Sequence, residues 1–309
     1  MLATGPGVTV AQPGDPVLLS FAFCESCPGC TRGYHSHCNT FNELNFGPQP
    51  AVFGKVGDEA NPTIPGAFFG QSSFASRSVV RQCSVVNAKC FVSSKQELQL
   101  LAPLGCGVQT GAGTVINAAG ATKEDIVCVL GLGGVGLSAV MGAKVAGCRR
   151  IIGVDRVASR LDLAKAMGAT DVVDTSKLPE GKTLVEAVRE VAEGLGPSIT
   201  VDTTGVPFLV KAAIDFARNR GKIVQVGSAP FDFKLEISVF DFMVRGLQYI
   251  GAVEGHAYPP DFVPKLVQWY KEGRFPVDKM MKLMPADQYE AALHEMHEGS
   301  TIKPILCWS

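Results

Sequence analysis

The chain has 309 residues, of which 46% are hydrophobic and 18% are charged. This length is enough for two domains, and this balance supports a large core and argues against intrinsic disorder. The formal net charge of -1 gives no electrostatic reason to expect nucleic acid or an anionic membrane as a partner.

Residues 1–105 predict an irregular β domain, because short β-prone runs such as 17–23 and 78–80 are broken by proline and glycine. The first ten residues contain neither a basic segment nor a continuous apolar one, so no signal peptide is visible. Six cysteines are scattered among apolar neighbours, which suits a reducing compartment and predicts a cytoplasmic protein. They are Cys83, Cys90, Cys106, Cys128, Cys148 and Cys307.

The other four cysteines form a C-x2-C-x2-C-x7-C motif. They are Cys24, Cys27, Cys30 and Cys38. Four thiolates at this spacing can surround one tetrahedral Zn²⁺ and leave no position for water, which predicts a structural zinc. Two disulfides, or four unrelated cysteines in a loop, are the alternatives, and disulfides are rare in intracellular chains. His35 and His37 lie in the same loop, and we expect them to be solvated, since four thiolates already saturate the metal.

A second motif begins with an apolar run at 126–130, continues as G-x-G-x-x-G and ends in a helix-like segment at 137–146. Residues 126–143 carry no charge and are long enough to span a bilayer, but the glycines favour a strand, a turn and a helix instead. In such a loop the first glycine permits the turn, the second admits a pyrophosphate, and the third lets the helix pack on the strand. The loop comprises Gly131, Leu132, Gly133, Gly134, Val135 and Gly136.

A second strand at 150–154 ends in Asp155, at the distance from the glycines where a carboxylate contacts the adenosine ribose. A carboxylate there accepts ribose hydroxyls and repels a 2′-phosphate, which favours NAD over NADP. Arg156 and Arg160 stand nearby and leave this preference incomplete. The alternative for Asp155 is a helix N-cap.

The alternation of strands and helices continues, with helices at 158–167, 184–193 and 207–216 and strands at 171–174, 199–202 and 221–226. This alternation predicts a doubly wound parallel sheet of the α/β class. Loops at the carboxyl ends of its strands should line the nicotinamide side, and these contain Thr204, Val226 and Gly227.

The last part of the chain predicts a strand at 249–253 and two amphipathic helices, which glycines 273 and 299 should terminate. The apolar faces of both helices are expected in the core. One face comprises Val263, Leu266, Val267 and Tyr270, and the other Tyr289, Ala292, Leu293 and Met296.

Taken in order, the Gly14-Asp15 turn, the cysteine lobe, the Gly105-Cys106-Gly107 motif and the nucleotide fingerprint resemble the zinc-containing alcohol dehydrogenases of the medium-chain dehydrogenase/reductase family. Residues 68–75 look most like the aryl-alcohol branch. The resemblance implies a partial GroES-like catalytic domain (1–107), an inserted Rossmann domain that binds NAD (108–252) and a return to the catalytic domain (253–309). It also implies a zinc-dependent hydride transfer between NAD and a primary alcohol or aldehyde, aromatic ones included, in a homodimer or homotetramer.

By its sequence context alone Cys106 is a buried, inert thiol, but in the resemblance it matches the third ligand of the catalytic zinc. Lys303 matches a basic position that contacts the cofactor pyrophosphate. The family's other two ligands, a cysteine and the histidine of a Gly-His-Glu motif, precede the segment that residues 1–10 resemble. We therefore expect one catalytic ligand and little alcohol oxidation. The alternatives are an inactive NAD-binding homologue and a zinc-free NAD(P)H reductase, a type that usually lacks the cysteine lobe.

Overall fold

A computed structural model describes residues 1–49, 51–54, 57–58 and 60–308 of the chain. It divides into two compact units. Unit 1 comprises Met1–Gln109, Ala257–Gln268 and Asp278–Ser309, and unit 2 comprises Thr110–His256 and Trp269–Val277.

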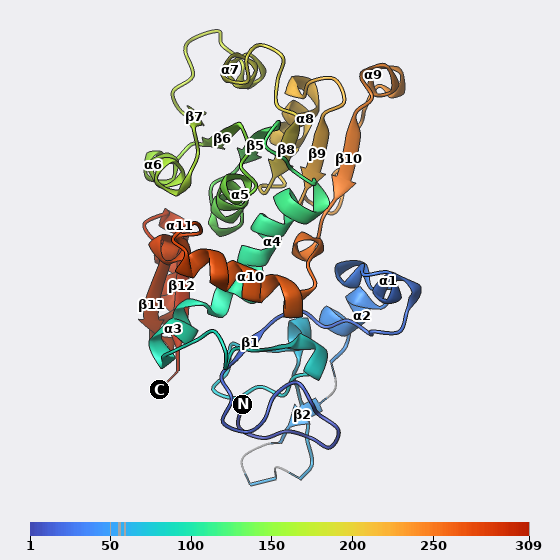
Figure 1. The fold of residues 1–309 in the computed structure, drawn as a ribbon, viewed down its shortest axis with the longest axis vertical. Helices are drawn as coiled ribbons and strands as arrows, with labels where there is room; N and C mark the ends of the chain where they lie inside the picture. Colours follow the sequence, from blue (N-terminus) through green and yellow to red (C-terminus); the bar gives the residue numbers. More distant parts are fainter. Residues whose placement is uncertain (50, 55–56, 59, 309) are drawn as a thin grey trace. The chain divides into compact units, whose positions relative to one another are not determined.

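Unit 2 is built on a six-stranded parallel sheet with the strand order β10-β9-β8-β5-β6-β7. Its strands are β5 (Ile126–Leu130), β6 (Arg150–Asp155), β7 (Asp171–Asp174), β8 (Ile199–Asp202), β9 (Lys222–Gln225) and β10 (Gln248–Gly251). The helices between them are α5 (Gly134–Val145), α6 (Ala158–Met167), α7 (Leu184–Val191), α8 (Pro207–Phe216) and α9 (Val239–Arg245). Helices α5 and α6 cover one face of the sheet, and α7 and α8 cover the other (Figure 1). The α/β fold predicted from the sequence is confirmed.

The sheet forms here because its central strands are apolar on both faces. All five residues of β5 are buried, as a parallel strand between two helical layers requires. Ile126, Cys128 and Leu130 share one core cluster with Val188 of α7 and Phe216 of α8. The uncharged stretch 126–143 is a strand, a turn and a helix, and no helix in the described part of the chain is long and apolar enough to cross a membrane.

The described residues of unit 1 form three small sheets. Strand β1 (Val17–Leu19) pairs antiparallel with β4 (Val85–Asn87), β2 (Ala51–Phe53) pairs with β3 (Ile64–Pro65), and β11 (Met281–Pro285) pairs parallel with β12 (Lys303–Cys307). Its helices are α1 (Pro28–Thr31), α2 (Phe41–Asn45), α3 (Lys95–Leu100) and α11 (Tyr289–Glu298), and α4 (Gly107–Gly113) and α10 (Pro259–Lys271) contribute residues to both units. Shorter helical turns occupy His35–His37, Phe68–Gly70, Gln82–Ser84, Ala102–Gly105, Thr114–Ala118, Glu254–His256, Val277–Met280 and Ala286–Gln288.

Two expectations for these outer elements are wrong. The β-prone residues 78–80 form no strand, and the strand begins instead at Val85, where two successive valines are buried. In α11 only Ala292 is buried, whereas Leu293 is 55% exposed. The two-stranded sheet β11–β12 is narrow, so the apolar face of α11 stays at the surface. By contrast, Val263, Leu266 and Val267 of α10 are fully buried, as expected, whereas Tyr270 of the same face is only half-buried.

Candidate functional site

The four cysteine sulfurs of unit 1 lie within 4.8 Å of one another. The Sγ atoms of Cys24 and Cys30 are 3.9 Å apart, and those of Cys27 and Cys38 are 4.0 Å apart. Zinc–sulfur bonds of about 2.3 Å put the sulfurs of a tetrahedron about 3.8 Å apart. The spacing and the all-sulfur donor set therefore fit a zinc ion with four protein ligands.

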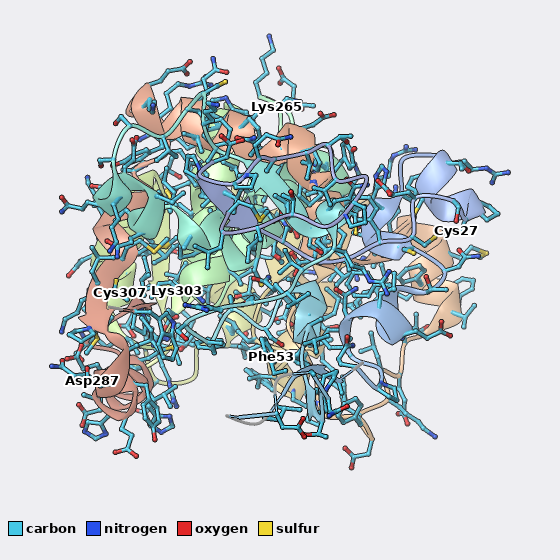
Figure 2. The ribbon with its side chains drawn as sticks, turned by 90° about the horizontal axis from the view of Figure 1, so that it is seen from below. Cys27, Phe53, Lys265, Asp287, Lys303 and Cys307 are labelled. Atoms are coloured by element: carbon cyan, nitrogen blue, oxygen red, sulfur yellow. The ribbon has the colours of Figure 1, made fainter. Side chains whose placement is uncertain are left out.

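The local backbone positions these thiols through the short helix α1. Cys27 caps this helix, and its Sγ accepts hydrogen bonds from the backbone N–H groups of Cys30 at 3.5 Å and Asn39 at 3.4 Å. Figure 2 labels Cys27 in this lobe. The N–H of Cys27 donates to Cys24 Sγ at 3.3 Å. Gly29 is required at its position, because a Cβ there would lie 2.9 Å from the carbonyl oxygen of His37.

Hydrogen-bond donors and burial shift the pKa values of these thiols in opposite directions. The backbone N–H groups of Ser26 and Cys27 lower the pKa of Cys24 to about 5, and those of Asn39 and Cys30 lower the pKa of Cys27. Burial raises the pKa of Cys30 to about 12. N–H donors stabilise the thiolate form that binds metal, while four thiolates in one cluster, two of them buried, need a cation to compensate their charges.

The expectation that His35 is solvated is wrong. Its ring stacks on Tyr258, with centroids 4.2 Å apart, and meets Phe23 edge-on at 4.8 Å. Within the described residues its Nδ1 is buried without a hydrogen-bond partner, and burial lowers the pKa of the imidazole. His35 therefore packs the cysteine lobe against Tyr258, the residue before α10, whereas His37 is exposed as expected.

Unit 2 contains a cavity of about 950 Å³ at the carboxyl ends of its strands. Ten of its lining residues are the glycine loop Gly131, Leu132, Gly133, Gly134, Val135 and Gly136, with Asp155, Arg160, Thr203 and Thr204. A cavity at this edge of a parallel sheet, beside the N-terminus of α5, is where α/β proteins bind dinucleotides.

The three glycines of the G-x-G-x-x-G motif meet different requirements. Gly131 has a φ of +84°, a left-handed conformation that glycine tolerates best. A Cβ at Gly136 would lie 1.8 Å from the carbonyl oxygen of Gly131, so the close packing of helix on strand excludes any side chain. Gly133 caps α5 and has nothing within 4 Å of a built Cβ, so open space for a ligand adjoins its backbone.

Asp155 lies at the end of β6 and also holds the loop in place. Its carboxylate accepts hydrogen bonds from the N–H of Leu132 at 2.7 Å and from the N–H of Val157 at 3.0 Å. It also accepts a hydrogen bond from the N–H of Arg156 at 2.7 Å. An ionised carboxylate has acceptor capacity beyond these three bonds, so it can also bind hydroxyl groups in the cavity. Arg160 of α6 lines the same cavity, and its Nε is buried without a hydrogen-bond partner in the part of the chain described.

Three of the expected cofactor residues lie outside this lining. Val226 and Gly227 follow β9, and their N–H groups donate to the carbonyl oxygen of Asp202, each at 2.9 Å. Lys303 begins β12 in unit 1, on the strand that ends at Cys307 (Figure 2).

Cys106 is exposed, so its interpretation as a buried thiol is wrong, and it lies between the turn Ala102–Gly105 and α4. Gly105 packs so closely that a Cβ would lie 1.8 Å from the carbonyl oxygen of Leu19. Its own carbonyl accepts hydrogen bonds from Ser20 Oγ at 2.7 Å and Gln109 Nε2 at 2.9 Å. In residues 1–49, 51–54, 57–58 and 60–308 the cysteine lobe is the one cluster of three or more metal-ligating side chains, so these residues do not fit a catalytic zinc at Cys106.

The sequence analysis missed the outer wall of the cavity. It comprises Val154, Thr175, Leu178, Lys182, Thr183, Leu184, Val206, Phe208 and Leu209, beside Arg156, which the sequence had placed near Asp155. Thr175–Leu184 follow β7, and the rule that loops at carboxyl strand ends line the site could have found them. The exposed Phe208 carried no such signal, because an aromatic residue in the first turn of a helix is ordinary.

Comparison with known proteins places this site in a family. Residues 134–272 match the family described as "Zinc-binding dehydrogenase". Geraniol dehydrogenase of Castellaniella defragrans is 35% identical over 305 residues, which are 98% of this chain and 80% of that protein.

Two solved structures agree with this similarity. The benzyl alcohol dehydrogenase of Acinetobacter calcoaceticus superimposes with a TM-score of 0.88 at 36% identity, covering 99% of this chain and 80% of the other. The alcohol dehydrogenase zinc-binding domain protein of Burkholderia ambifaria gives 0.89 at 37% identity, with the same coverage.

The chain belongs to the zinc-binding alcohol dehydrogenases, which are oxidoreductases. The family resemblance found in the sequence is thereby confirmed. Zinc and NAD, the two cofactors expected from the sequence, are the cofactors of this family.

Proposed function

We propose that the chain binds NAD(H) in the cavity of unit 2 and transfers a hydride between the nicotinamide and a small-molecule alcohol or aldehyde. The observation that carries this proposal is the glycine loop at the start of α5, with open space beside Gly133 and the carboxylate of Asp155 at the adjoining strand end. Unit 2 is thus the NAD-binding domain and unit 1 the catalytic domain. The proposed cofactor contacts are Gly131, Gly133, Gly134, Val135, Gly136, Asp155, Arg160, Thr204, Val226, Gly227 and Lys303.

The four-cysteine lobe is proposed to hold one structural zinc. Cys24, Cys27, Cys30 and Cys38 are the ligands, and their mutual spacing and N–H donors support this assignment. The ion would tie together a loop whose own core is small. This retained lobe also argues against the zinc-free reductase.

The proposed substrates are primary alcohols and their aldehydes, aromatic ones included. Two relatives carry the names geraniol dehydrogenase and benzyl alcohol dehydrogenase. Geraniol and benzyl alcohol are both primary alcohols whose carbinol carbon adjoins an sp² carbon. Allylic and benzylic alcohols are therefore the first compounds to test.

A second candidate function is NAD(H) binding without turnover. Cys106 supports it, because within the described residues this thiol belongs to no group of three or more metal-ligating side chains. The test is NADH formation from NAD with benzyl alcohol and with geraniol, each with and without a zinc chelator. Chelator-sensitive turnover supports the dehydrogenase, whereas NADH binding with no turnover supports the second candidate.

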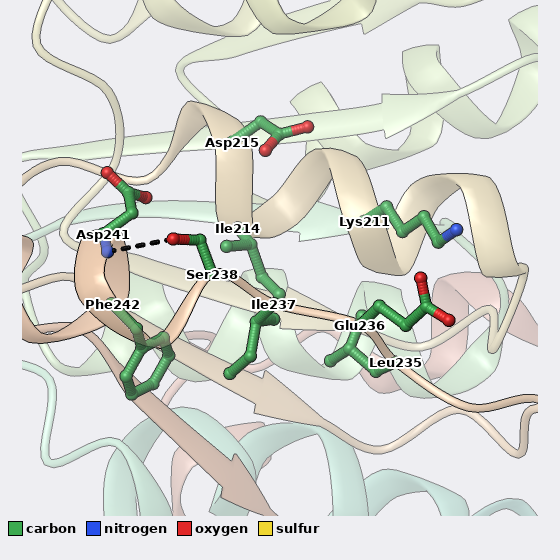
Figure 3. A pocket seen from close by; sticks show the side chains of 9 residues that line it. All are labelled: Lys211, Ile214, Asp215, Leu235, Glu236, Ile237, Ser238, Asp241 and Phe242. Atoms are coloured by element: carbon green, nitrogen blue, oxygen red, sulfur yellow. Dashed lines mark hydrogen bonds between the residues drawn. The ribbon is translucent and has the colours of Figure 1, made fainter.

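We also propose that the protein is a cytoplasmic homodimer or homotetramer. The scattered reduced cysteines support the compartment. Subunit association is supported by α9, where Val239, Phe240, Met243 and Val244 are 62–78% exposed next to the edge strand β10. Figure 3 shows the groove between α8 and α9 that adjoins this surface, where Ser238 Oγ accepts a hydrogen bond from the N–H of Asp241.

A further inference from the structure

A chain of side-chain hydrogen bonds crosses the sheet of unit 2 beside the cofactor cavity. The hydroxyl of Tyr249 on the edge strand β10 donates to Gln225 Oε1 on β9 at 2.8 Å. The Nε2 of Gln225 donates to Asp202 Oδ2 on β8 at 2.6 Å and to the carbonyl oxygen of Gly227 at 2.7 Å. The chain therefore links three neighbouring strands to the loop that follows β9.

Asp202 is the inner end of this chain and is fully buried. Its carboxylate accepts four hydrogen bonds, from Thr204 N at 3.2 Å, Thr204 Oγ1 at 2.7 Å, Gly205 N at 2.9 Å and Gln225 Nε2. All four donors are neutral groups, so the buried charge depends on every one of them. Such a carboxylate fixes the backbone of the loop that follows β8.

The side-chain amide of Gln225 has a defined orientation in this series of hydrogen bonds. Its amide nitrogen faces two acceptors, and its amide oxygen faces the Tyr249 hydroxyl. Burial and the charge of Asp202 raise the pKa of Tyr249, so the phenol stays protonated and acts as the donor. The two acceptors, the Asp202 carboxylate and the Gly227 carbonyl, thus fix the amide orientation, and the Tyr249 hydroxyl satisfies the amide oxygen that remains.

The two loops that this amide joins touch through their backbones. A Cβ at Gly227 would lie 2.3 Å from Gly205 N, and a Cβ at Gly205 would lie 2.2 Å from the carbonyl oxygen of Ser228. Thr204 at the same time faces Gly131 of the glycine loop, where a Cβ would lie 2.6 Å from Thr204 Cγ2. A shift of either loop therefore changes the wall of the cavity.

We propose that Tyr249, Gln225 and Asp202 are positioning residues for the nicotinamide half of the cofactor, which they act on by fixing the loops at Thr204 and Gly227. This inference rests on the proposed binding of NAD(H) in unit 2. None of the three residues bonds to Asp155, and they reach the glycine loop indirectly, where Thr204 packs against Gly131, so the adenosine half of the cofactor depends on them less than the nicotinamide half does.

The test compares NADH with ADP-ribose, which has the adenosine, both riboses and the pyrophosphate but lacks the nicotinamide. The full chain and its Gln225→Leu variant are titrated with each ligand by calorimetry. Loss of hydrogen bonds to a buried charge predicts that Gln225→Leu raises the Kd of NADH by about tenfold or more, while that of ADP-ribose changes by less than about twofold. Substitution of a residue that is needed only for folding would instead weaken the binding of both ligands alike.

Tyr249→Phe removes a single hydroxyl and tests the same series of hydrogen bonds if the Gln225→Leu variant does not fold. It is expected to raise the Kd of NADH by a smaller factor and to leave the Kd of ADP-ribose unchanged. Gln248→Leu is the matched control, since Gln248 is an exposed glutamine on the same edge strand, and it should alter neither Kd. Equal losses for both ligands, or no loss for NADH in both Tyr249→Phe and Gln225→Leu, would overturn the inference. Failure of the unmodified chain to bind either ligand would instead refute the proposed function.

Discussion

Two glycines of the loop, only three positions apart, are expected to respond to alanine in opposite ways. In Gly136→Ala the new methyl group would lie 1.8 Å from the carbonyl oxygen of Gly131 and 3.3 Å from Thr203 Oγ1. A clash with backbone cannot be relieved by a change of rotamer, so the cost should reach the upper end of overpacking, about 3 kcal/mol. For a unit of this size that corresponds to a loss of about 6–12 °C in Tm.

Gly133→Ala is the matched variant. The position has a φ of −77° and nothing within 4 Å of a built Cβ, so the fold should tolerate alanine and Tm should stay within about 1 °C of the parent. The methyl group would occupy the space that a pyrophosphate needs, and NADH binding should weaken by about tenfold or more. Thermal unfolding and NADH titration of both variants check this. A stable Gly136→Ala, or a Gly133→Ala variant that binds NADH like the parent, would refute the geometry assigned to the loop.

The remaining predictions concern metal, cofactor and acid stability. Metal analysis should give one zinc per chain, which Cys27→Ser abolishes and Cys90→Ser, at an exposed cysteine outside the cluster, leaves unchanged; two equivalents would contradict the single site. NAD(H) should bind more tightly than NADP(H), and Asp155→Ala should narrow or invert the ratio of the two Kd values; equal affinities in the parent would argue against the ribose role. The backbone N–H and hydroxyl of Thr183 hold the pKa of Glu186 below its ordinary value of 4.5. The ionised carboxylate therefore stabilises α7 fully above pH 4.5, and this stabilisation is lost as the pH falls through the lowered pKa. Glu186→Gln should therefore flatten the acid limb of a Tm-against-pH curve, and an unchanged limb would show that this capping box contributes nothing to acid stability.

The nucleotide-binding unit could be predicted from the sequence because its signals are local. Strands buried on both faces are continuous apolar runs, and β5, β7 and β8 have the bounds that those runs predict. Gly131 and Gly136 carry the backbone constraints that their spacing implies. The convergence of the four cysteine sulfurs was likewise predictable, since all four lie in one short loop.

What the sequence could not predict depends on partners distant along the chain. His35 is half-buried because it stacks on Tyr258, and nothing near residue 35 indicates that contact. The helix α11 has a periodic apolar face, yet the width of the sheet beside it decides how much of that face is covered. The link between Gln225 and Asp202 is also a tertiary contact, between residues that looked like ordinary strand ends.

The most direct test of the central claim is a crystal structure of the full chain with NADH bound. The account predicts one NADH per chain in the cavity of unit 2, with its pyrophosphate against the backbone at Gly133 and its adenosine ribose within hydrogen-bond distance of Asp155. NADH bound elsewhere, or in this cavity with its ribose turned away from Asp155, would contradict the account.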